Sequence, residues 1–175
     1  MNAVISSMAD ANRLATTGRI VEGVVALGDL PRLTGLLVEP FGSVNYKLVF
    51  STDMVGRACV RVVLNGAARL LCQRSLEGFD FKIDSDTQLG FIATEEEESA
   101  LMPDFDPILV DPVLIAQEAI TPLGLVEDEL ILLIPPVPVN PALSNTESPG
   151  VWQARAPEKA HPFATLGSLL KTKPS

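Results

Sequence analysis

The pattern of apolar and polar positions is most regular between residues 121 and 139, which read TPLGLVEDELILLIPPVPV. Large apolar residues recur there at spacings of three and four, as on one face of a helix; they are Leu123, Val126, Leu130, Leu133 and Ile134. Thr121 is a suitable N-cap, and Pro122 takes the first helical position, where proline is favoured. Pro135 ends the pattern, because the residue before a proline is pushed out of the helical region. We therefore predict a core helix from Thr121 to Ile134, with a buried strand beginning at Glu129 as the alternative.

The chain before this helix favours strands, because β-branched residues are frequent and apolar and polar positions alternate. A short helix is predicted over Ser7–Thr17, with Gly18 at its end. Asp29 is a candidate cap for a further helical turn whose apolar face is Leu33, Leu36 and Leu37. The predicted strands are Arg19–Leu27, Val44–Ser51, Ala58–Leu64, Ala67–Cys72, Leu76–Ile83, Gln88–Ile92 and an edge strand at Ile108–Asp111.

Two turns are predicted among these strands. Asn65-Gly66 suits a type I′ hairpin, because both residues tolerate positive φ. That pairing puts Arg69 at the rim of a core face formed by Val60, Val62, Leu64, Ala67 and Leu71, with Arg61 on the opposite face. Asp84-Ser85-Asp86 suits a second turn, and Glu95–Glu98 is predicted to be a solvated acidic loop.

Composition divides the chain into three parts. Residues 1–139 are predicted to form an α+β core domain, in which a curved antiparallel sheet or partial barrel is covered by one main helix. Residues 140–160 have the proline-rich, polar composition of a flexible linker. Residues 161–175 are predicted to be a tail with a short amphipathic helix whose apolar side is Phe163, Leu166 and Leu170.

Charge is distributed unevenly. The net charge is −9, but residues 1–82 hold nine Lys or Arg against seven Asp or Glu. Residues 83–154 hold fourteen acidic residues and neither Lys nor Arg, and the tail from Arg155 is basic again. This layout predicts a surface with two electrostatic faces and excludes a uniformly basic nucleic-acid binder. No apolar run approaches the roughly 20 residues of a membrane span, and the start lacks a signal peptide, so we expect a cytoplasmic protein.

The residues that carry chemistry are few. Cys59, Cys72 and His161 are too few ligands for tetrahedral zinc, and a cytosolic pair of cysteines is expected to stay reduced and half-buried. Glu127, Asp128 and Glu129 invite an acid–base interpretation, but consecutive helical residues splay apart. A solvated acidic face is therefore the preferred interpretation, and a carboxylate hydrolase or nuclease with magnesium is a minor alternative.

Five basic residues on or beside the predicted hairpin form a candidate RNA surface: Arg57, Arg61, Arg69, Arg74 and Lys82. Arginine on a two-stranded ribbon is suited to backbone phosphates. The alternative is ordinary surface arginine that offsets acidic neighbours. Candidate partner-binding residues are the acidic triplet together with Phe163, Leu166 and Leu170, and the tail helix either binds a partner or folds back onto its own core.

Three motifs resemble the YceD family, whose members are called large ribosomal RNA subunit accumulation proteins. They are LCQRSLEGF at Leu71–Phe79, VEDELILLIPPVPV at Val126–Val139 and HPFATLGSLLK at His161–Lys171. Family members often carry a second cysteine three positions after the one that corresponds to Cys72. They also often have a His or Cys after the proline segment that begins here at Pro135. Here these places hold Ser75 and Asn140, so the resemblance implies that any family metal site beside Cys72 is lost and that no cofactor is needed.

The resemblance implies a bacterial, cytoplasmic, non-enzymatic factor that supports accumulation of large-subunit ribosomal RNA. Such a factor acts in synthesis, processing or protection of the precursor, and its partners are that RNA or a ribosome assembly protein. In our hypothesis the arginines contact RNA phosphates while the acidic half meets a basic protein. The alternative is an acidic interaction module, or chaperone for basic ribosomal proteins, that makes no RNA contact.

Overall fold

A computed structural model describes residues 3–37, 39–110 and 119–143. The chain divides into two units, residues 1–139 and 140–175. Unit 1 is an α+β domain in which helices pack on a five-stranded sheet. In the second unit the described residues form one 3-10 turn, η3 (Pro141–Leu143). This turn lies within the predicted linker, residues 140–160, whose remainder from residue 144 lies outside the described residues together with the predicted tail helix.

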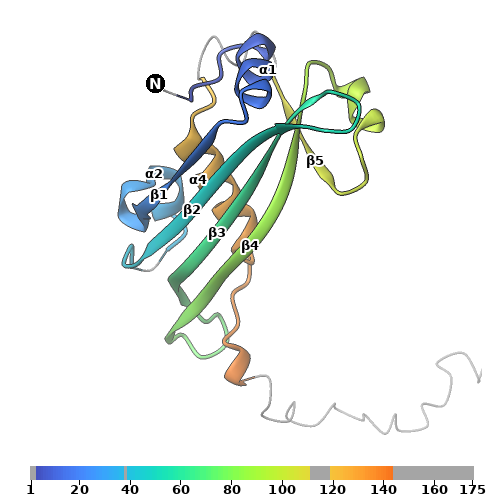
Figure 1. Cartoon of the computed structure of the whole chain (residues 1–175). Helices are drawn as coiled ribbons and strands as arrows, with labels where there is room; N and C mark the ends of the chain where they lie inside the picture. The colour runs from blue at the N-terminus through green and yellow to red at the C-terminus, as the bar shows by residue number, and fades with distance from the viewer. Residues whose placement is uncertain (1–2, 38, 111–118, 144–175) are drawn as a thin grey trace, which may run out of the picture. The chain divides into compact units, whose positions relative to one another are not determined.

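The sheet follows chain order, β1-β2-β3-β4-β5, and does not close into a barrel (Figure 1). The first four strands are antiparallel, and β5 pairs in parallel with β4, so the prediction of a wholly antiparallel sheet was wrong at its last strand. A parallel neighbour needs a crossover connection, which residues 93–104 provide through the exposed 3-10 helix η2 (Glu95–Ala100). The strands are β1 (Ile20–Ala26), β2 (Ser43–Thr52), β3 (Ala58–Leu71), β4 (Gly78–Ile92) and β5 (Phe105–Leu109).

The predicted hairpin at Asn65-Gly66 was wrong, because both residues lie inside the continuous strand β3. Asn65 pairs with Asn45 on one side and with Asp84 on the other. The glycine serves a close backbone approach: a Cβ at Gly66 would lie 2.5 Å from the carbonyl oxygen of Ser43. A local turn signal was therefore overridden by pairing with a strand more than ten residues away along the chain.

The second predicted turn, Asp84–Asp86, was also wrong, since these residues lie within the long strand β4. Their polarity arises because Asp84 and Asp86 are exposed on the outer face, whereas Ile83 is buried. An uninterrupted β3 also changes the predicted faces beyond Gly66: Ala68 and Leu70 are buried and Arg69 is exposed. Arg69 consequently lies on the same face as Arg61.

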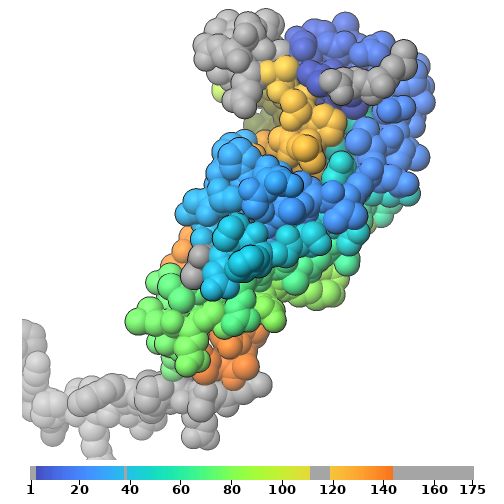
Figure 2. Space-filling view, turned by 90° about the vertical axis from the view of Figure 1, so that its left-hand side faces the viewer, coloured from blue at the N-terminus to red at the C-terminus, as the bar shows by residue number. Residues whose placement is uncertain are grey.

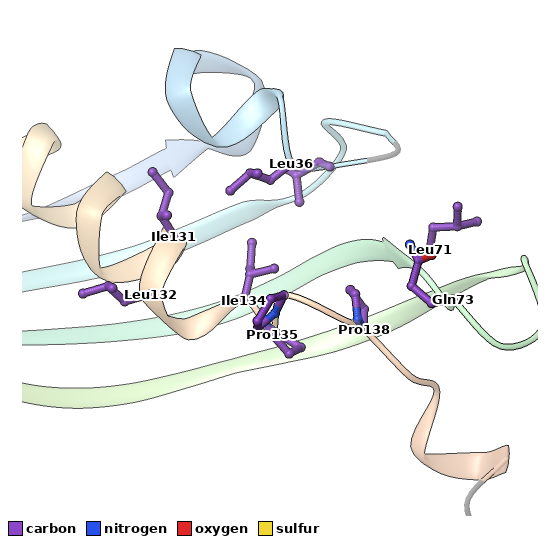
Figure 3. A pocket seen from close by; sticks show the side chains of 10 residues that line it. Leu36, Leu71, Gln73, Ile131, Leu132, Ile134, Pro135 and Pro138 are labelled. Carbon is purple, nitrogen blue, oxygen red and sulfur yellow. The ribbon is translucent and has the colours of Figure 1, made fainter.

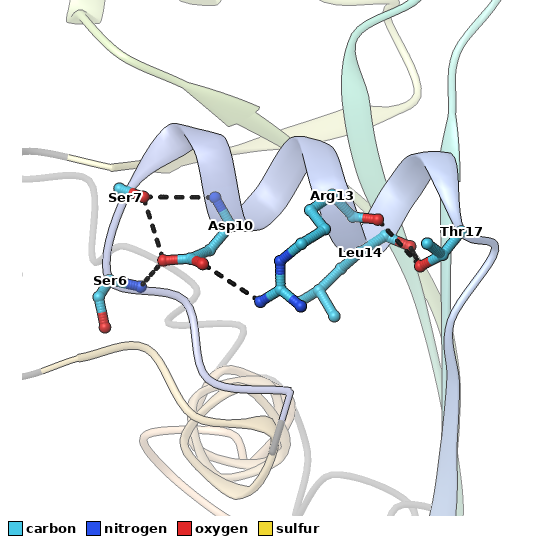
Figure 4. A network of polar contacts seen from close by, with 6 residues as sticks. All are labelled: Ser6, Ser7, Asp10, Arg13, Leu14 and Thr17. Atoms are coloured by element: carbon cyan, nitrogen blue, oxygen red, sulfur yellow. Dashed lines mark hydrogen bonds and ion pairs between the residues drawn. The ribbon is translucent and has the colours of Figure 1, made fainter. Parts of the chain in front are cut away.

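Helix α1 (Met8–Thr16) confirms the predicted first helix. Ser7 is its N-cap and its hydroxyl accepts from the amide of Asp10, while the Asp10 carboxylate bonds Arg13 one turn later (Figure 4). Gly18 ends the segment with φ +59°. Leu14 and Ala15 are buried, and the helix packs against β2 and β3, so α4 is not the only helix that covers the sheet.

Helix α4 (Pro122–Leu133) confirms the core helix and excludes the strand alternative. The Thr121 hydroxyl accepts from the amide of Gly124 at 3.0 Å, and Ile134 is the C-cap. In Figure 1 the helix lies behind the sheet. Its buried face differs from the predicted one: Leu123 is 45% exposed, whereas Leu125, Val126, Glu127, Glu129 and Leu130 are buried. No helix among the described residues is long and apolar enough to cross a membrane.

The helical turn predicted after Asp29 is present as α2 (Pro31–Thr34), but its cap differs. Asp29 belongs to a preceding 3-10 turn, η1 (Leu27–Asp29), and the residue at the N-cap of α2 is Leu30, which has no side-chain acceptor. Leu33 and Leu37 are buried as predicted, while Leu36 is 53% exposed. The amides at the start of α2 are satisfied from another part of the chain.

Candidate functional site

The carboxylate of Glu127 on α4 caps α2. One of its oxygens accepts from the amides of Arg32 at 2.6 Å and Leu33 at 3.0 Å. A negative charge is favourable at a helix N-terminus, where amide protons are free. Glu127 is only 6% exposed, so its predicted place on a solvated acidic face was wrong. This buried bond holds α2 against α4.

Asp128 also joins α4 to α2, through a contact at the protein surface. Its carboxylate forms an ion pair with the guanidinium of Arg32, and both side chains are about half exposed. The predicted solvated character therefore holds for Asp128 in part, but this carboxylate already has a partner. Figure 2 shows the first half of α4 (gold) at the surface next to the segment that contains α2 (blue).

Glu129 is the third member of the triplet and is 9% exposed. Burial raises the pKa of its carboxyl, and the negative charges of Asp106 and Asp128 raise it further. A hydrogen bond with the Thr87 side chain on β4 acts in the opposite direction. Glu129 is therefore a crowded acid turned toward the sheet, in contrast to the solvated position predicted for it.

These carboxylates line a hollow of about 350 Å³ between α4 and β5, which we call the acidic hollow. Its acidic residues are Asp106, Asp128 and Glu129, and its remaining lining is apolar, with Leu89, Ile108 and Leu125 among the residues that contribute. Lys and Arg are absent from its lining. Within the described ranges, no group of three His, Cys, Asp or Glu side chains is arranged to hold a metal ion.

A second hollow, about 520 Å³ in volume, lies at the other end of α4 (Figure 3); we call it the apolar groove. One side is formed by the end of α4 and the prolines that follow: Ile131, Leu132, Ile134, Pro135, Pro136 and Pro138. The other side is formed by Leu36 and Leu37 after α2 and by Leu71 and Gln73 at the end of β3. Its lining is largely aliphatic.

The β3–β4 turn closes one end of the apolar groove. The amide of Gln73 donates to the carbonyl of Pro138 at 2.9 Å, which joins the turn to the proline segment. Leu76 adopts φ +59°, and its amide donates to the carbonyl of Cys72, so the turn is internally bonded. Two of the motifs noted in the sequence thus meet at one groove.

Leu132 lines both hollows and is 79% exposed. The sequence prediction missed its role, along with those of Ile131 and Leu36. One signal was present: residues 130–134 are five aliphatics in succession, more than one face of a helix accommodates. Most of the aliphatic residues of this run that are not buried in the core line the apolar groove.

Three of the five predicted RNA residues lie on the outer face of the sheet, and each is ion-paired: Arg61, Arg69 and Lys82. Arg61 makes two bonds with Asp86 across β3 and β4, Nε–Oδ1 at 2.7 Å and Nη2–Oδ2 at 2.5 Å, which lower the pKa of the aspartate. Arg69 bonds Asp80 at 2.9 Å. Lys82 bonds Asp84 at 2.5 Å and lowers the pKa of that aspartate.

The remaining two basic residues lie apart from this face. Arg57 closes the β2–β3 turn by pairing with Asp53, whose side chain is 4% exposed. Burial acts against the shift, yet the amides of Arg57 and Val55 lower the pKa of Asp53 overall. Arg74 is exposed in the β3–β4 turn and makes no ion pair with any described residue.

Both cysteines are buried rather than half-buried, and neither forms a disulfide. Cys59 lies in β3 and Cys72 directly after it, so an extended strand separates them by about 40 Å. The hairpin predicted at Asn65-Gly66 would place these two cysteines opposite one another, and this consequence of it is wrong as well. Ser75 offers no thiolate beside Cys72, so these residues do not fit a metal site of the family type. Phe163, Leu166 and Leu170 lie outside the described residues.

Over the described residues the protein has an α+β fold in which the acidic hollow and the apolar groove lie along α4 and the opposite face of the sheet is charge-paired. No solved structure matches the chain. Residues 60–170 match the family described as Large ribosomal RNA subunit accumulation protein YceD, and the chain belongs to this family. The resemblance drawn from its three motifs is thereby confirmed.

Proposed function

We propose that this protein is a non-enzymatic ribosome-biogenesis factor that supports the accumulation of large-subunit ribosomal RNA, in synthesis, processing or protection of its precursor. The observation that carries the proposal is family membership across residues 60–170. The proposal includes a cytoplasmic location, where ribosomes are assembled.

A protein partner is the mode of action that the geometry favours. The acidic hollow has no Lys or Arg in its lining, and it adjoins the apolar groove along α4. Ribosomal RNA would be repelled by this surface, whereas a basic ribosomal or assembly protein would be attracted to it. In this mode of action, Asp128 would contribute to binding the basic protein, as predicted from the sequence.

Direct RNA contact is the second candidate, and one observation favours it. The uninterrupted β3 brings Arg61 and Arg69 onto one exposed face, together with Lys47 and Lys82. Four carboxylates are paired with these four cations: Glu22, Asp80, Asp84 and Asp86. The face is therefore neutral in sum, and phosphate binding there requires that existing ion pairs be broken or shared.

Cells that lack the protein test the function itself. We expect the ratio of large- to small-subunit ribosomal RNA to fall and to recover when the intact chain is supplied. An unchanged ratio would contradict the proposed function. Incubating purified protein with precursor RNA and Mg²⁺ tests the non-enzymatic part: the RNA should stay intact, and cleavage lost in Asp128→Asn would favour the nuclease alternative.

RNA affinity measured against salt concentration separates the two modes. Phosphate contact gives a steep decrease of log affinity with log salt, which becomes shallower when Arg61, Arg69 and Arg74 are changed to alanine. Arg13→Ala is the matched control, because Arg13 is also an exposed, ion-paired arginine but lies on α1. A flat slope, or equal effects of both changes, would leave protein binding as the mode of action.

A further inference from the structure

Two hollows of different chemistry are adjacent along α4. The apolar groove and the acidic hollow share Leu132, whose side chain is 79% exposed. The groove volume of about 520 Å³ falls within the range of ligand pockets and accommodates a few aliphatic side chains. A single extended ligand that passes over Leu132 would reach both hollows.

The carboxylates of the acidic hollow determine which ligand charge fits. Asp106 is exposed, Asp128 is half exposed and Glu129 is buried, and no cation lines the hollow with them. Arg32 pairs with Asp128, but Asp106 makes no ion pair with any described residue. An added Lys or Arg would therefore reduce repulsion among three neighbouring negative charges.

We propose that α4 binds a peptide segment of a basic protein, with aliphatic residues in the apolar groove and an adjacent Lys or Arg in the acidic hollow. This inference rests on the proposed function, of which it specifies the partner chemistry. Phosphate is disfavoured by the carboxylates. A second copy of this chain is disfavoured because both copies carry a net charge of −9.

Selection from a phage-displayed random peptide library, with the full chain as target, tests the proposal without choosing the ligand in advance. We expect enrichment of peptides in which two or three aliphatic residues stand next to Lys or Arg. Enrichment of acidic or purely polar peptides would overturn the proposal, as would equal recovery of the same peptides on Leu132→Asp.

Fluorescence anisotropy with one selected peptide then measures each half of the site. Leu132→Asp should weaken binding at least about tenfold, because a charge enters the apolar groove. Leu123→Asp is the matched control, since Leu123 is 45% exposed on the same helix but lines neither hollow, and it should leave binding unchanged. Equal losses in both variants would contradict the proposed location.

The acidic half is tested by Asp106→Asn, which should weaken the same peptide about threefold at low salt and less at high salt. Asp84→Asn on the outer sheet face is the control and should have no effect. Two results would assign the groove to another occupant and overturn the proposal. One is a dimer of the intact protein that Leu132→Asp dissociates, and the other is peptide binding that strengthens when Phe163 and Leu166 are changed to Asp.

Different results would overturn the peptide-binding proposal and the proposed function. If Leu132→Asp abolishes peptide binding but restores large-subunit RNA in the deleted cells as well as the intact chain does, the peptide site is not used in cells and the inference fails. The function proposal would stand in that case. If deletion leaves the RNA ratio unchanged, the function proposal fails whatever the peptide does.

Discussion

The outer face of the sheet and the α4 side carry similar numbers of carboxylates but organise them differently. On the outer face each carboxylate lies beside a cation, as Asp86 does beside Arg61, so the surface is neutral in sum. On the α4 side the carboxylate of Glu127 accepts hydrogen bonds from two backbone amides. Asp106 and Glu129 line the acidic hollow, whose lining contains no cation. Local pairing, rather than residue counts, thus determines where charge remains to act on a partner.

The strongest test of this comparison removes the cap at Glu127. Glu127→Ala should lower the free energy of unfolding by roughly 3 kcal/mol, because two amides of α2 lose a charged acceptor in a buried place. Urea denaturation gives the value. Asp128→Ala is the control and should cost less than about 1 kcal/mol, as an exposed ion pair does. Similar costs for the two changes would mean that the triplet is the solvated face first expected.

A second prediction concerns the strand that brings the basic residues together. Gly66→Ala should cost about 2 kcal/mol, because the new Cβ would lie 2.5 Å from the Ser43 carbonyl oxygen and would force β2 and β3 apart. Asn65→Ala, at an exposed neighbouring position of β3, should be nearly neutral in the same denaturation experiment. If Asn65→Ala were the more damaging change, a tight turn at this place would be the better interpretation.

Glu129→Gln should raise the free energy of unfolding near pH 7 by roughly 1 kcal/mol, because it removes a buried charge next to two like charges. The folded-state pKa of Glu129 is raised above the ordinary value of 4.5, so the folded protein binds this proton more tightly than the unfolded chain does. Its contribution to stability is therefore present at low pH and lost as pH rises from about 4.5 through the folded pKa.

Denaturation of the two proteins from pH 4 to pH 8 checks this sign. The advantage of the Gln variant should be small at pH 4 and should grow with pH. Glu96→Gln on the exposed η2 helix is a control in which no such growth is expected. An advantage that shrinks as pH rises would contradict the burial and crowding of Glu129.

The smallest expected effect is on the outer face. Asp86→Asn should change stability by less than about 1 kcal/mol, because its pair with Arg61 is half exposed. The change frees Arg61, so RNA affinity at low salt should rise about threefold if this face contacts phosphate. Filter binding of large-subunit RNA fragments measures it, with Asp10→Asn on α1 as the matched release of Arg13. No increase would leave the α4 side as the functional surface.

Local signals predicted part of this fold well. Thr121 caps α4 as predicted, α1 lies within the range predicted for the first helix and Gly18 follows it, and β1 and β2 lie within two residues of their predicted bounds. These features depend on residues close in sequence, such as a hydroxyl three positions before an amide. The α+β class followed from the same signals.

The errors share one physical cause, which is contact between distant segments. Asn65-Gly66 forms a turn only if no strand pairs on both sides, and here β2 and β4 do. Glu127 resembles a solvated acid until α2, 95 residues away along the chain, places two free amides beside it. The parallel pairing of β5 and the shared position of Leu132 between two hollows are likewise invisible to a pattern of spacings.

The sequence alone therefore determined the family, the capped helices and the division of the chain into a charge-mixed part and an acidic part. Only the tertiary structure decided which charges are paired and which acidic residues are buried. It also decided where the aliphatic residues outside the core line the apolar groove. The reason is that helix caps and apolar spacing depend on interactions between residues close together in the sequence. Charge pairing and burial depend on distances that only the packed chain sets.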